Sequence, residues 1–354
     1  MRVCLIASSR FPIREPLAGG LEAHTFALAR ALLQRGHQVS LFAAEGSCHG
    51  LDVEDLPASL FRASTAARAD VGARPEDWMR EHHAYLDLML MLARDTGRFD
   101  VVHNNSLHHL PLAMASMLDV PVVTTLHTPP LDWLESAIAF APPSCRFVAV
   151  SEAMARAWSH VVTPTVVLNG VDTDQWAYGD GGGPAVWSGR LVPEKAPHLA
   201  ALACRLLDRE LVLAGPVMDR AYFEREVRPL LGDRIRYAGH LTHAELVRLL
   251  QAASVALVTP VWDEPYGLVA AEAMSCGTPV AAFARGGIPE IVDDTSGRLA
   301  HGHDALALAA AVGEASALDR RAVRGRAVSS FSLERMVDGY EQVYAGATRP
   351  ALAS

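Results

Sequence analysis

Two glutamates lie on either side of seven residues at a predicted strand-to-helix junction. Glu264 falls in the turn after the strand, and Glu272 lies about one turn into a helix that begins at Gly267 or Leu268. Both carboxylates can therefore point towards one ligand in the crevice beyond the strand. Carboxylate oxygens readily accept hydrogen bonds from adjacent hydroxyl groups, such as those of sugars and riboses. The spacing predicts a site for a polyhydroxylated ligand.

The start of the same helix predicts an anion site. The first N–H groups of a helix have no partner within the helix, and they carry a partial positive charge. The backbone N–H groups of Tyr266, Gly267 and Leu268 are therefore expected to face a ligand beyond the carboxyl edge of the strand.

Two cations and two glycines have the chemistry to extend this site. Arg190 and Lys195 follow a predicted strand at 185–188, where they could converge on a diphosphate and neutralise a leaving group. Gly19 and Gly20 precede a predicted helix, and their lack of side chains would let backbone N–H groups approach phosphates closely. Taken alone, the cations also fit a solvated loop and the glycines a plain turn, since the fuller GxGxxG fingerprint is absent.

The elements that must position these residues follow an α/β pattern. Short apolar runs alternate with longer amphipathic runs, which is typical of parallel sheets covered by helices. The predicted strands are 3–7, 38–43, 101–104, 120–126, 147–150 and 165–168 in the first half, and 185–188, 210–214, 234–238 and 255–259 in the second. The segment from about 48 to 76 is the least regular part of the chain.

A flexible break predicts two domains. Residues 180–184 read Asp-Gly-Gly-Gly-Pro, which offers no core-forming side chain just before a fresh strand. The chain has 354 residues, enough for two ordinary globular cores. The last apolar run, 333–344, has helical spacing and needs a surface to pack on, so it is expected to cross back to the first domain.

The amino-acid composition disfavours several classes of function. Lys and Arg number 31 against 40 Asp and Glu, a formal charge of -9, which disfavours binding to nucleic acid or anionic lipid. The five cysteines are scattered and never form a CxxC pair, so neither a disulfide framework nor a zinc site is indicated. The sequence starts directly with a strand-like stretch and contains no apolar run of membrane-spanning length. These features predict a cytoplasmic protein without strong membrane association.

The motifs together resemble the retaining glycosyltransferases of family 4, which have the GT-B fold. The family hallmark is Glu, seven residues, Glu, and Glu264 and Glu272 reproduce it. The resemblance extends in the expected order over nearly the whole chain, through Gly-Gly-Leu-Glu (19–22), Thr-Leu-His (125–127), Val-Ala-Val-Ser-Glu (148–152), Asn-Gly-Val-Asp (169–172) and Gly-Arg-Leu-Val-Pro-Glu-Lys (189–195). Family members often carry His-x-His after the third or fourth strand, whereas here His103 is followed by Asn104 and Asn105.

The resemblance implies two Rossmann-like domains whose parallel sheets face a central cleft. Residues 1–168, joined by a C-terminal helix at 332–354, would bind the acceptor, and residues 169–331 would bind a nucleotide diphosphate sugar. Asp172 and Asp174 imitate a metal-binding DxD, but they belong to the crossing segment, so a metal-independent reaction without a cofactor is expected.

The resemblance also implies roles for individual residues. Arg190 and Lys195 would bind the diphosphate, and Glu272 would accept hydrogen bonds from the two ribose hydroxyls. His127 would contact the transferred sugar. Glu264 would bind hydroxyls of that sugar, although a covalent nucleophile is the alternative. Backbone groups near Gly239 and Leu241 are placed to read the base, without identifying it.

The predicted reaction is transfer from a nucleotide diphosphate sugar, with a UDP-sugar as the first choice, to a hydroxyl of a small soluble acceptor. Specialised-metabolite or saccharide biosynthesis would fit this reaction. Fold alone does not fix the reaction, so a nucleotide-sugar epimerase, a phosphorylase and a two-lobed ligand-binding protein stay open as alternatives. The oligomeric state is also left open.

Overall fold

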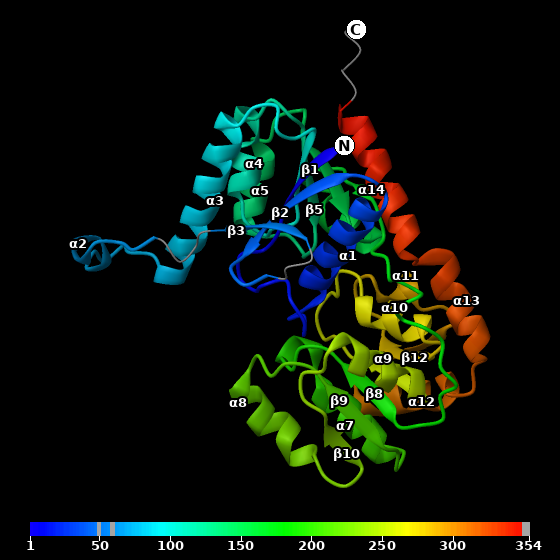
Figure 1. Cartoon of the computed structure of the whole chain (residues 1–354). Helices are drawn as coiled ribbons and strands as arrows, with labels where there is room; N and C mark the ends of the chain where they lie inside the picture. Colours follow the sequence, from blue (N-terminus) through cyan, green and yellow to red (C-terminus); the bar gives the residue numbers. More distant parts are fainter. Residues whose placement is uncertain (48–50, 57–60, 349–354) are drawn as a thin grey trace.

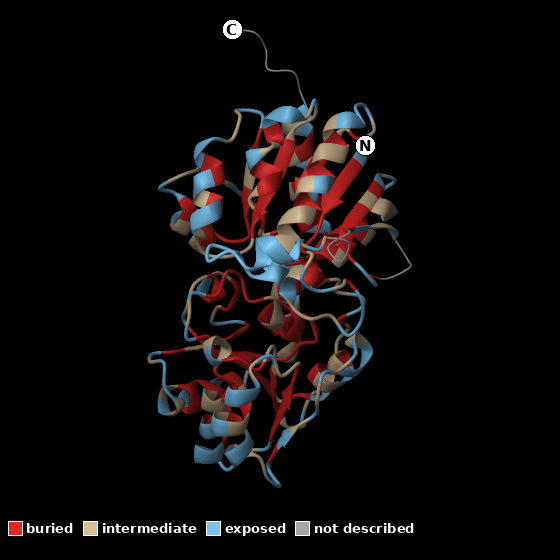
Figure 2. Ribbon diagram, turned by 90° about the vertical axis from the view of Figure 1, so that its left-hand side faces the viewer, coloured by how far each residue is buried: buried red, intermediate tan, exposed pale blue. Residues whose placement is uncertain are grey.

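The computed structural model describes residues 1–47, 51–56 and 61–348. The chain forms two lobes, one above the other in Figure 1, and each lobe contains one parallel sheet. In Figure 2 most of the strand residues in both lobes are buried, whereas most exposed segments lie on helices and loops around them. This arrangement confirms the α/β prediction, because parallel strands covered on both faces read as short apolar runs in sequence.

The sheet of the first lobe has the order β3-β2-β1-β4-β5-β6-β7, and every pairing is parallel. Its strands are β1 (Arg2–Ile6), β2 (Gln38–Ala44), β3 (Asp52–Leu56), β4 (Val101–Asn104), β5 (Val122–Leu126), β6 (Arg146–Ala149) and β7 (Thr165–Val166). The strand order reverses between β1 and β4. In such sheets ligands bind beyond the carboxyl ends of the strands, at the point of reversal.

The second sheet repeats this plan in the order β10-β9-β8-β11-β12-β13, again with parallel pairings. Its strands are β8 (Ala185–Ser188), β9 (Leu211–Ala214), β10 (Ile235–Tyr237), β11 (Val255–Val258), β12 (Val280–Phe283) and β13 (Gly297–Ala300). The reversal lies between β8 and β11. The loops that follow these two strands carry Arg190 and Lys195 on one side and Glu264 on the other.

Helices cover both sheets. Those of the first lobe are α1 (Gly20–Gln34), α2 (Thr65–Arg68), α3 (Glu76–Arg94), α4 (Leu110–Ala113), α5 (Asp132–Ala139) and α6 (Glu152–Trp158). Those that follow are α7 (Pro197–Leu206), α8 (Arg220–Tyr222), α9 (His243–Ala252), α10 (Leu268–Ser275), α11 (Ile288–Ile291), α12 (Ala305–Ala315), α13 (Arg320–Ser330) and α14 (Leu333–Thr348). None of the described helices combines the length and the apolar character needed to cross a membrane.

The last helix returns to the first lobe, as predicted. α14 rises along the side of that lobe in Figure 1, and its buried residues join the core formed by β1 and α1. The two chain crossings pair with each other: the Val171 N–H donates to the Phe331 carbonyl (2.8 Å), and the Leu333 N–H donates to the Val171 carbonyl (2.9 Å). Residues 349–354 of the predicted helix lie outside the described residues.

Three local predictions differ from the structure. The segment predicted to be irregular contains β3 and α2 in its described part, while its residues 48–50 and 57–60 lie outside the described residues. β3 is an edge strand that reads Asp-Val-Glu-Asp-Leu. Its acidic side chains do not form the apolar run that predicts a strand. β7 is shorter than predicted, because the chain leaves the sheet after Val166. The helix predicted from Asp219 continues past α8 as a π turn at 223–227 and a 3-10 turn at 228–230.

Candidate active site

A cavity of about 410 Å³ lies between the two lobes, with walls from the carboxyl edges of both sheets. Every predicted site residue except Gly239 contributes to its wall. These residues are Gly19, Gly20, His127, Arg190, Lys195, Leu241, Glu264, Tyr266, Gly267, Leu268 and Glu272. Residues that are far apart in sequence therefore meet in one place.

Gly239 is not among the residues that line the cavity, and the role in binding the base that was expected near it stays a prediction. Its carbonyl accepts a hydrogen bond from the Gly215 N–H (2.8 Å), which ties the end of β10 to the end of β9. The following residues, His240 and Leu241, line the cavity instead. The His240 side chain also reaches the first lobe, where Nε2 lies 3.0 Å from the Leu17 carbonyl oxygen.

Lys195 and Glu264 form a charged pair in the cavity wall. The Lys195 Nζ lies 2.5 Å from the Glu264 Oε2, and the side chains are 22% and 12% exposed. The Trp262 Nε1–H also donates to this oxygen (3.1 Å), and the Trp262 ring lies 5.4 Å from the ammonium group. Lys195 is the only lysine in the sequence. The pair leaves Glu264 Oε1 without a described donor, so this oxygen can accept a hydrogen bond from a ligand hydroxyl.

Glu272 is a buried carboxyl group that lies on α10. It is 9% exposed, and burial raises its pKa to about 8 without an opposing charge or hydrogen bond. Its position in the cavity wall makes its oxygens available to a ligand. Hydrogen bonds donated by ligand hydroxyls would stabilise the charged form of this buried carboxyl group.

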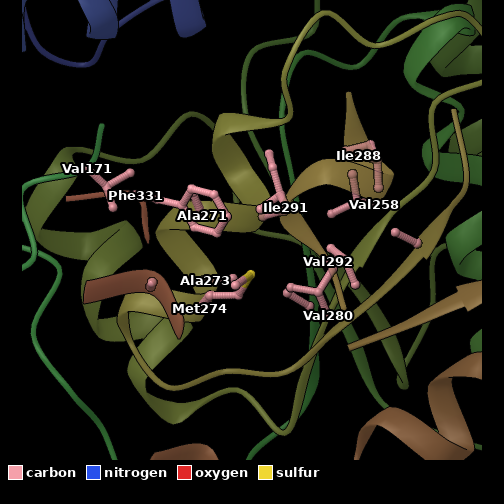
Figure 3. Close-up of a cluster of buried hydrophobic side chains, with 14 of the residues drawn as sticks. Val171, Val258, Ala271, Ala273, Met274, Val280, Ile288, Ile291, Val292 and Phe331 are labelled. Carbon is pink, nitrogen blue, oxygen red and sulfur yellow. The ribbon is translucent and has the colours of Figure 1, made fainter. Parts of the chain in front are cut away.

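The position of Glu272 depends on how α10 packs. Figure 3 shows Ala271, Ala273 and Met274 among buried aliphatic side chains, which fixes the helix against its neighbours. The helix begins after Gly267, whose φ of +102° is left-handed. A Cβ on Gly267 would lie 2.3 Å from the Ile288 Cδ1, so this turn has no room for a side chain. The first N–H groups of α10 consequently lie at the cavity.

Two further glycines bring the ends of β8 and β9 together in the cavity wall: Gly189, which opens the motif at 189–195 but had no predicted role of its own, and Gly215, which was not singled out from the sequence. Gly189 and Gly215 both have positive φ values, +148° and +136°. A Cβ on Gly215 would lie 1.9 Å from the Gly189 carbonyl oxygen. Both residues line the cavity together with Arg190, and the lack of side chains lets their backbones approach each other closely.

Arg190 faces the first lobe across the cavity, near Gly19 and Glu22. A Cβ on Gly19 would lie 3.3 Å from the Glu22 Oε2 and 3.8 Å from the Arg190 Cδ. Glu22 is buried, and burial raises its pKa although the Arg190 charge acts in the opposite direction. Glu22 ends the Gly-Gly-Leu-Glu motif at 19–22, although the sequence predicted no role for its side chain.

His127 follows β5 and forms a buried polar cluster with Asn105, which the sequence marked only as a departure from the family pattern, and with His24, which was not predicted. Its Nε2 lies 2.7 Å from the Asn105 Oδ1, and its ring centroid lies 4.8 Å from that of His24. Burial lowers the pKa of His127 well below its usual value and that of His24 to about 4, so both rings are neutral at physiological pH. No sequence motif marked His24, because only the fold brings α1 beside β5.

Hydrogen bonds between the lobes hold the cavity walls together. The Ser151 hydroxyl of the first lobe donates to the Pro265 carbonyl of the second (2.6 Å), and the Tyr266 hydroxyl donates to the Asn169 carbonyl in the crossing segment (2.6 Å). The Glu290 carboxylate accepts from the N–H groups of Glu152 (2.8 Å) and Ala153 (2.7 Å) at the start of α6. These contacts give structural roles to Glu290 and to Tyr266.

The Asp172 carboxylate binds backbone N–H groups of its own segment. Its Oδ1 accepts hydrogen bonds from the N–H groups of Asp174 (3.1 Å) and Gln175 (3.0 Å), which closes a turn in the crossing segment. Within the described ranges, no three His, Cys, Asp or Glu side chains are grouped so as to hold a metal ion.

Comparison with known proteins covers both lobes. Residues 18–175 match the sequence profile described as Glycosyltransferase Family 4, and residues 182–325 match Glycosyl transferases group 1. Glycogen synthase of Mycobacterium tuberculosis is 29% identical, with 99% of this chain and 95% of the relative covered. D-inositol 3-phosphate glycosyltransferase of Xylanimonas cellulosilytica is 30% identical, with 99% and 98% covered. The crystal structure of Anabaena HepE in complex with UDP and glucose is similar with a TM-score of 0.74 and 18% identity, covering 98% of this chain and 99% of that chain.

Proposed function

Because the chain belongs to the family 4 glycosyltransferases, we propose that it transfers a sugar from a UDP-sugar to a hydroxyl group of a small acceptor with retention of anomeric configuration. The observation that carries this proposal is the convergence of Glu264, Glu272, Arg190 and Lys195 on one cavity between the lobes. The reaction would be metal-independent and cytoplasmic, with no cofactor.

The nucleotide part of the donor would lie against the second lobe. Glu272 would accept hydrogen bonds from the two ribose hydroxyls. Arg190, Lys195 and the start of α10 would bind the diphosphate and stabilise the negative charge that develops as it leaves. The choice of UDP is supported by Anabaena HepE, which was crystallised with UDP and glucose. The base would lie near Leu241.

The transferred sugar would lie between Glu264 and His127, with Glu264 as a hydroxyl-binding group. Lys195 and Trp262 both hold its Oε2, and this stabilisation of the charge makes the carboxylate a weaker nucleophile. These contacts favour hydroxyl binding over covalent catalysis by Glu264. In the same-face reaction that we propose, the acceptor oxygen bonds to the anomeric carbon as the bond to the diphosphate oxygen breaks. The departing diphosphate oxygen takes the acceptor proton.

The single lysine offers a direct test of donor binding. Amine acetylation followed by mass spectrometry would report on Lys195 alone among side chains, with the N-terminal amine as an internal control. We expect saturating UDP to slow acetylation of Lys195 by about tenfold or more, because the diphosphate would cover Nζ, and to leave the N-terminal amine unaffected. Equal labelling of Lys195 with and without UDP would contradict the assignment.

Site variants extend this test to turnover. Glu272→Gln and Lys195→Met should each raise the Kd for UDP and reduce sugar transfer by about 10²-fold or more, since each loses a charge-assisted contact with the donor. The matched control is Glu314→Gln in α12, whose side chain is 68% exposed. The proposal fails if both site variants turn over as fast as this control.

A further inference from the structure

Five aromatic rings of the first lobe form a continuous series of contacts that does not belong to the cavity wall. Trp78, His82 and Tyr85 lie on one face of α3, and His108 and His109 lie in the loop that leads into α4. The centroid distances between successive rings are 5.2 Å for Trp78–His82, 6.1 Å for His82–His109, 4.4 Å for His109–His108 and 4.6 Å for His108–Tyr85. We call these five residues the ring ladder. It fastens α3 to the neighbouring α4, which lies beside it in Figure 1.

The inner end of the ring ladder is fixed at the rim of the cavity. Tyr85 is fully buried, and its hydroxyl donates to the Ala7 carbonyl (2.9 Å) and accepts from the Ser9 N–H (3.0 Å). Ser8, between these two residues, lines the cavity, and so does Leu107, which directly precedes the two ladder histidines of the loop. The ring ladder therefore holds the loops after β1 and β4, which supply part of the first-lobe rim of the cavity.

The ring ladder contains three neutral imidazoles. His108 is 6% exposed, and its Nδ1 accepts a hydrogen bond from the Leu110 N–H (3.2 Å), so the ring proton is on Nε2. Neither this Nε2 nor the His82 Nδ1 has a hydrogen-bond partner among the described residues. Burial lowers the pKa of His108 to about 3, and it lowers the pKa of His82 and of His109 below the ordinary value of 6.5. At neutral pH all three rings are therefore uncharged.

The surroundings of the ring ladder offer no free negative charge to an added proton. The charged or titratable side chains that face it are Arg74, Glu81 and His83 of α3 and Arg10 of the loop after β1. Glu81 is already engaged by Arg10 (3.3 Å). The histidines that form ion pairs within the described part of the chain, His37 and His160, lie elsewhere. Two protonated rings of the ladder would therefore repel each other without compensation.

We propose that the ring ladder is an acid-sensitive clamp. Neutral rings hold α3 to the loop before α4, whereas protonation of two imidazoles separates the rings by charge repulsion and releases the first-lobe rim of the cavity. The half-buried His82 and His109 take up protons before the buried His108. The ladder contains no side chain of the second lobe, so the second-lobe wall keeps its structure. This inference goes beyond the proposed function, because the clamp needs no substrate.

The direction of the acid effect follows from the histidines of the ladder. An unfolded histidine binds its proton below about pH 6.5, whereas the ladder histidines bind theirs only at lower pH. The open state therefore binds more protons than the clamped state as the pH falls. The stabilising contribution of the ladder is complete above pH 6.5 and is lost progressively below it.

Imidazole titration in the wild-type protein tests the first step. Long-range proton–nitrogen correlation spectra at pH 7 should show His108 as the Nε2–H tautomer. His82 and His109 should titrate below pH 6.5, and the indole signals of Trp78 should shift in the same steps. The inference is overturned if His82 and His109 titrate at or above their ordinary value.

Amide hydrogen exchange tests the release of the rim. After correction for the intrinsic rate at each pH, exchange in residues 76–94 and 105–109 should rise at least tenfold between pH 7 and pH 5, whereas exchange in α10 should not. His82→Phe/His109→Phe keeps two aromatic rings that cannot take up a proton, so the rise should be less than twofold in this variant. His160→Phe removes an exposed imidazole elsewhere in the first lobe and should behave as the wild type does. If the double variant does not fold, the wild-type titration decides.

Two further outcomes would contradict the clamp. Equal acid-induced exchange in His82→Phe/His109→Phe and in the wild type would assign it to other buried imidazoles of the first lobe, those of His24, His103 and His127. Unchanged exchange in the wild-type protein down to pH 5 would show that the ladder is a rigid part of the core. None of these measurements uses a substrate, so failure of the clamp is distinguishable from failure of the proposed transferase function.

Discussion

Glu272 shows how burial alone prepares a side chain for a ligand. The carboxyl group lies in the cavity wall, and burial raises its pKa to about 8 from an ordinary value of 4.5. Near neutral pH the unliganded protein therefore keeps this group mainly protonated. Ribose hydroxyls that donate to both oxygens would favour the charged form, so donor binding and loss of the proton should be linked.

This linkage predicts opposite pH trends for UDP binding and for stability. The affinity for UDP should rise between pH 7 and pH 9, and binding should release protons in that range. Calorimetry in buffers of different ionisation enthalpy measures both quantities. The contribution of Glu272 to the free energy of unfolding should fall as the pH rises from about 4.5 to about 8. In this range the folded state holds a proton that the unfolded state has released. Glu272→Gln should remove both trends, and a variant that keeps them would refute the assignment.

At the scale of single elements, α10 is positioned by a turn that only glycine can occupy. Gly267 has a left-handed conformation directly before the helix, and its missing side chain lets Ile288 pack against the turn. The N–H groups at the start of α10 and the Glu272 side chain depend on the same turn. A change of this one residue should therefore disturb both the packing of the second lobe and the predicted diphosphate site.

A pair of glycine substitutions tests this dependence. Gly267→Ala should lower the free energy of unfolding by about 1–3 kcal/mol, through backbone strain and a clash with Ile288, and should weaken UDP binding. Gly313→Ala in α12 is the control, because a Cβ there meets no atom within 4 Å. The control should raise stability by about 0.5–1 kcal/mol, as expected for alanine in a helix. Urea unfolding measures both changes, and equal effects of the two substitutions would argue against the role of Gly267.

At the scale of the whole molecule, the lobes are joined by contacts as well as by two chain crossings. The Glu290 carboxylate, from α11 in the second lobe, binds the first two N–H groups of α6 in the first lobe. A negative charge at this end of a helix is favourable, and hydrogen bonds to a charged acceptor are stronger than neutral ones. Glu290 therefore helps to fix the separation of the cavity walls.

Removal of this contact should loosen the two lobes. Glu290→Ala is expected to reduce the free energy of unfolding by about 1–2 kcal/mol, since two helix N–H groups lose their acceptor. The radius of gyration from solution scattering should increase in the same variant, and saturating UDP should partly restore it. Glu314→Ala, which removes an exposed carboxylate from α12, should change neither quantity measurably. An unchanged radius of gyration for Glu290→Ala would show that the other contacts hold the lobes together without Glu290.

Sequence patterns that are local in the chain determined the architecture and most of the site. Buried parallel strands are short apolar runs, and strand ends carry turn residues, so the edges bearing Glu264, Arg190 and Gly19 could be placed without coordinates. The acidic edge strand β3 has no such pattern, because only one side of an edge strand is paired and its side chains remain polar. The α/β fold was thus predictable, although that strand was not.

The tertiary structure decided which side chains share the cavity and which partners they have. The contact of Lys195 with Glu264 spans 69 residues, and that of His127 with Asn105 joins two neighbouring strands. The place of His24 is set by α1 packing beside β5, and the Gly239 carbonyl is bound by the N–H group of Gly215, a residue of the neighbouring loop. Local periodicity fixes how a segment folds and which of its faces is apolar. It leaves open which polar groups of distant segments meet, since that depends on how the lobes pack.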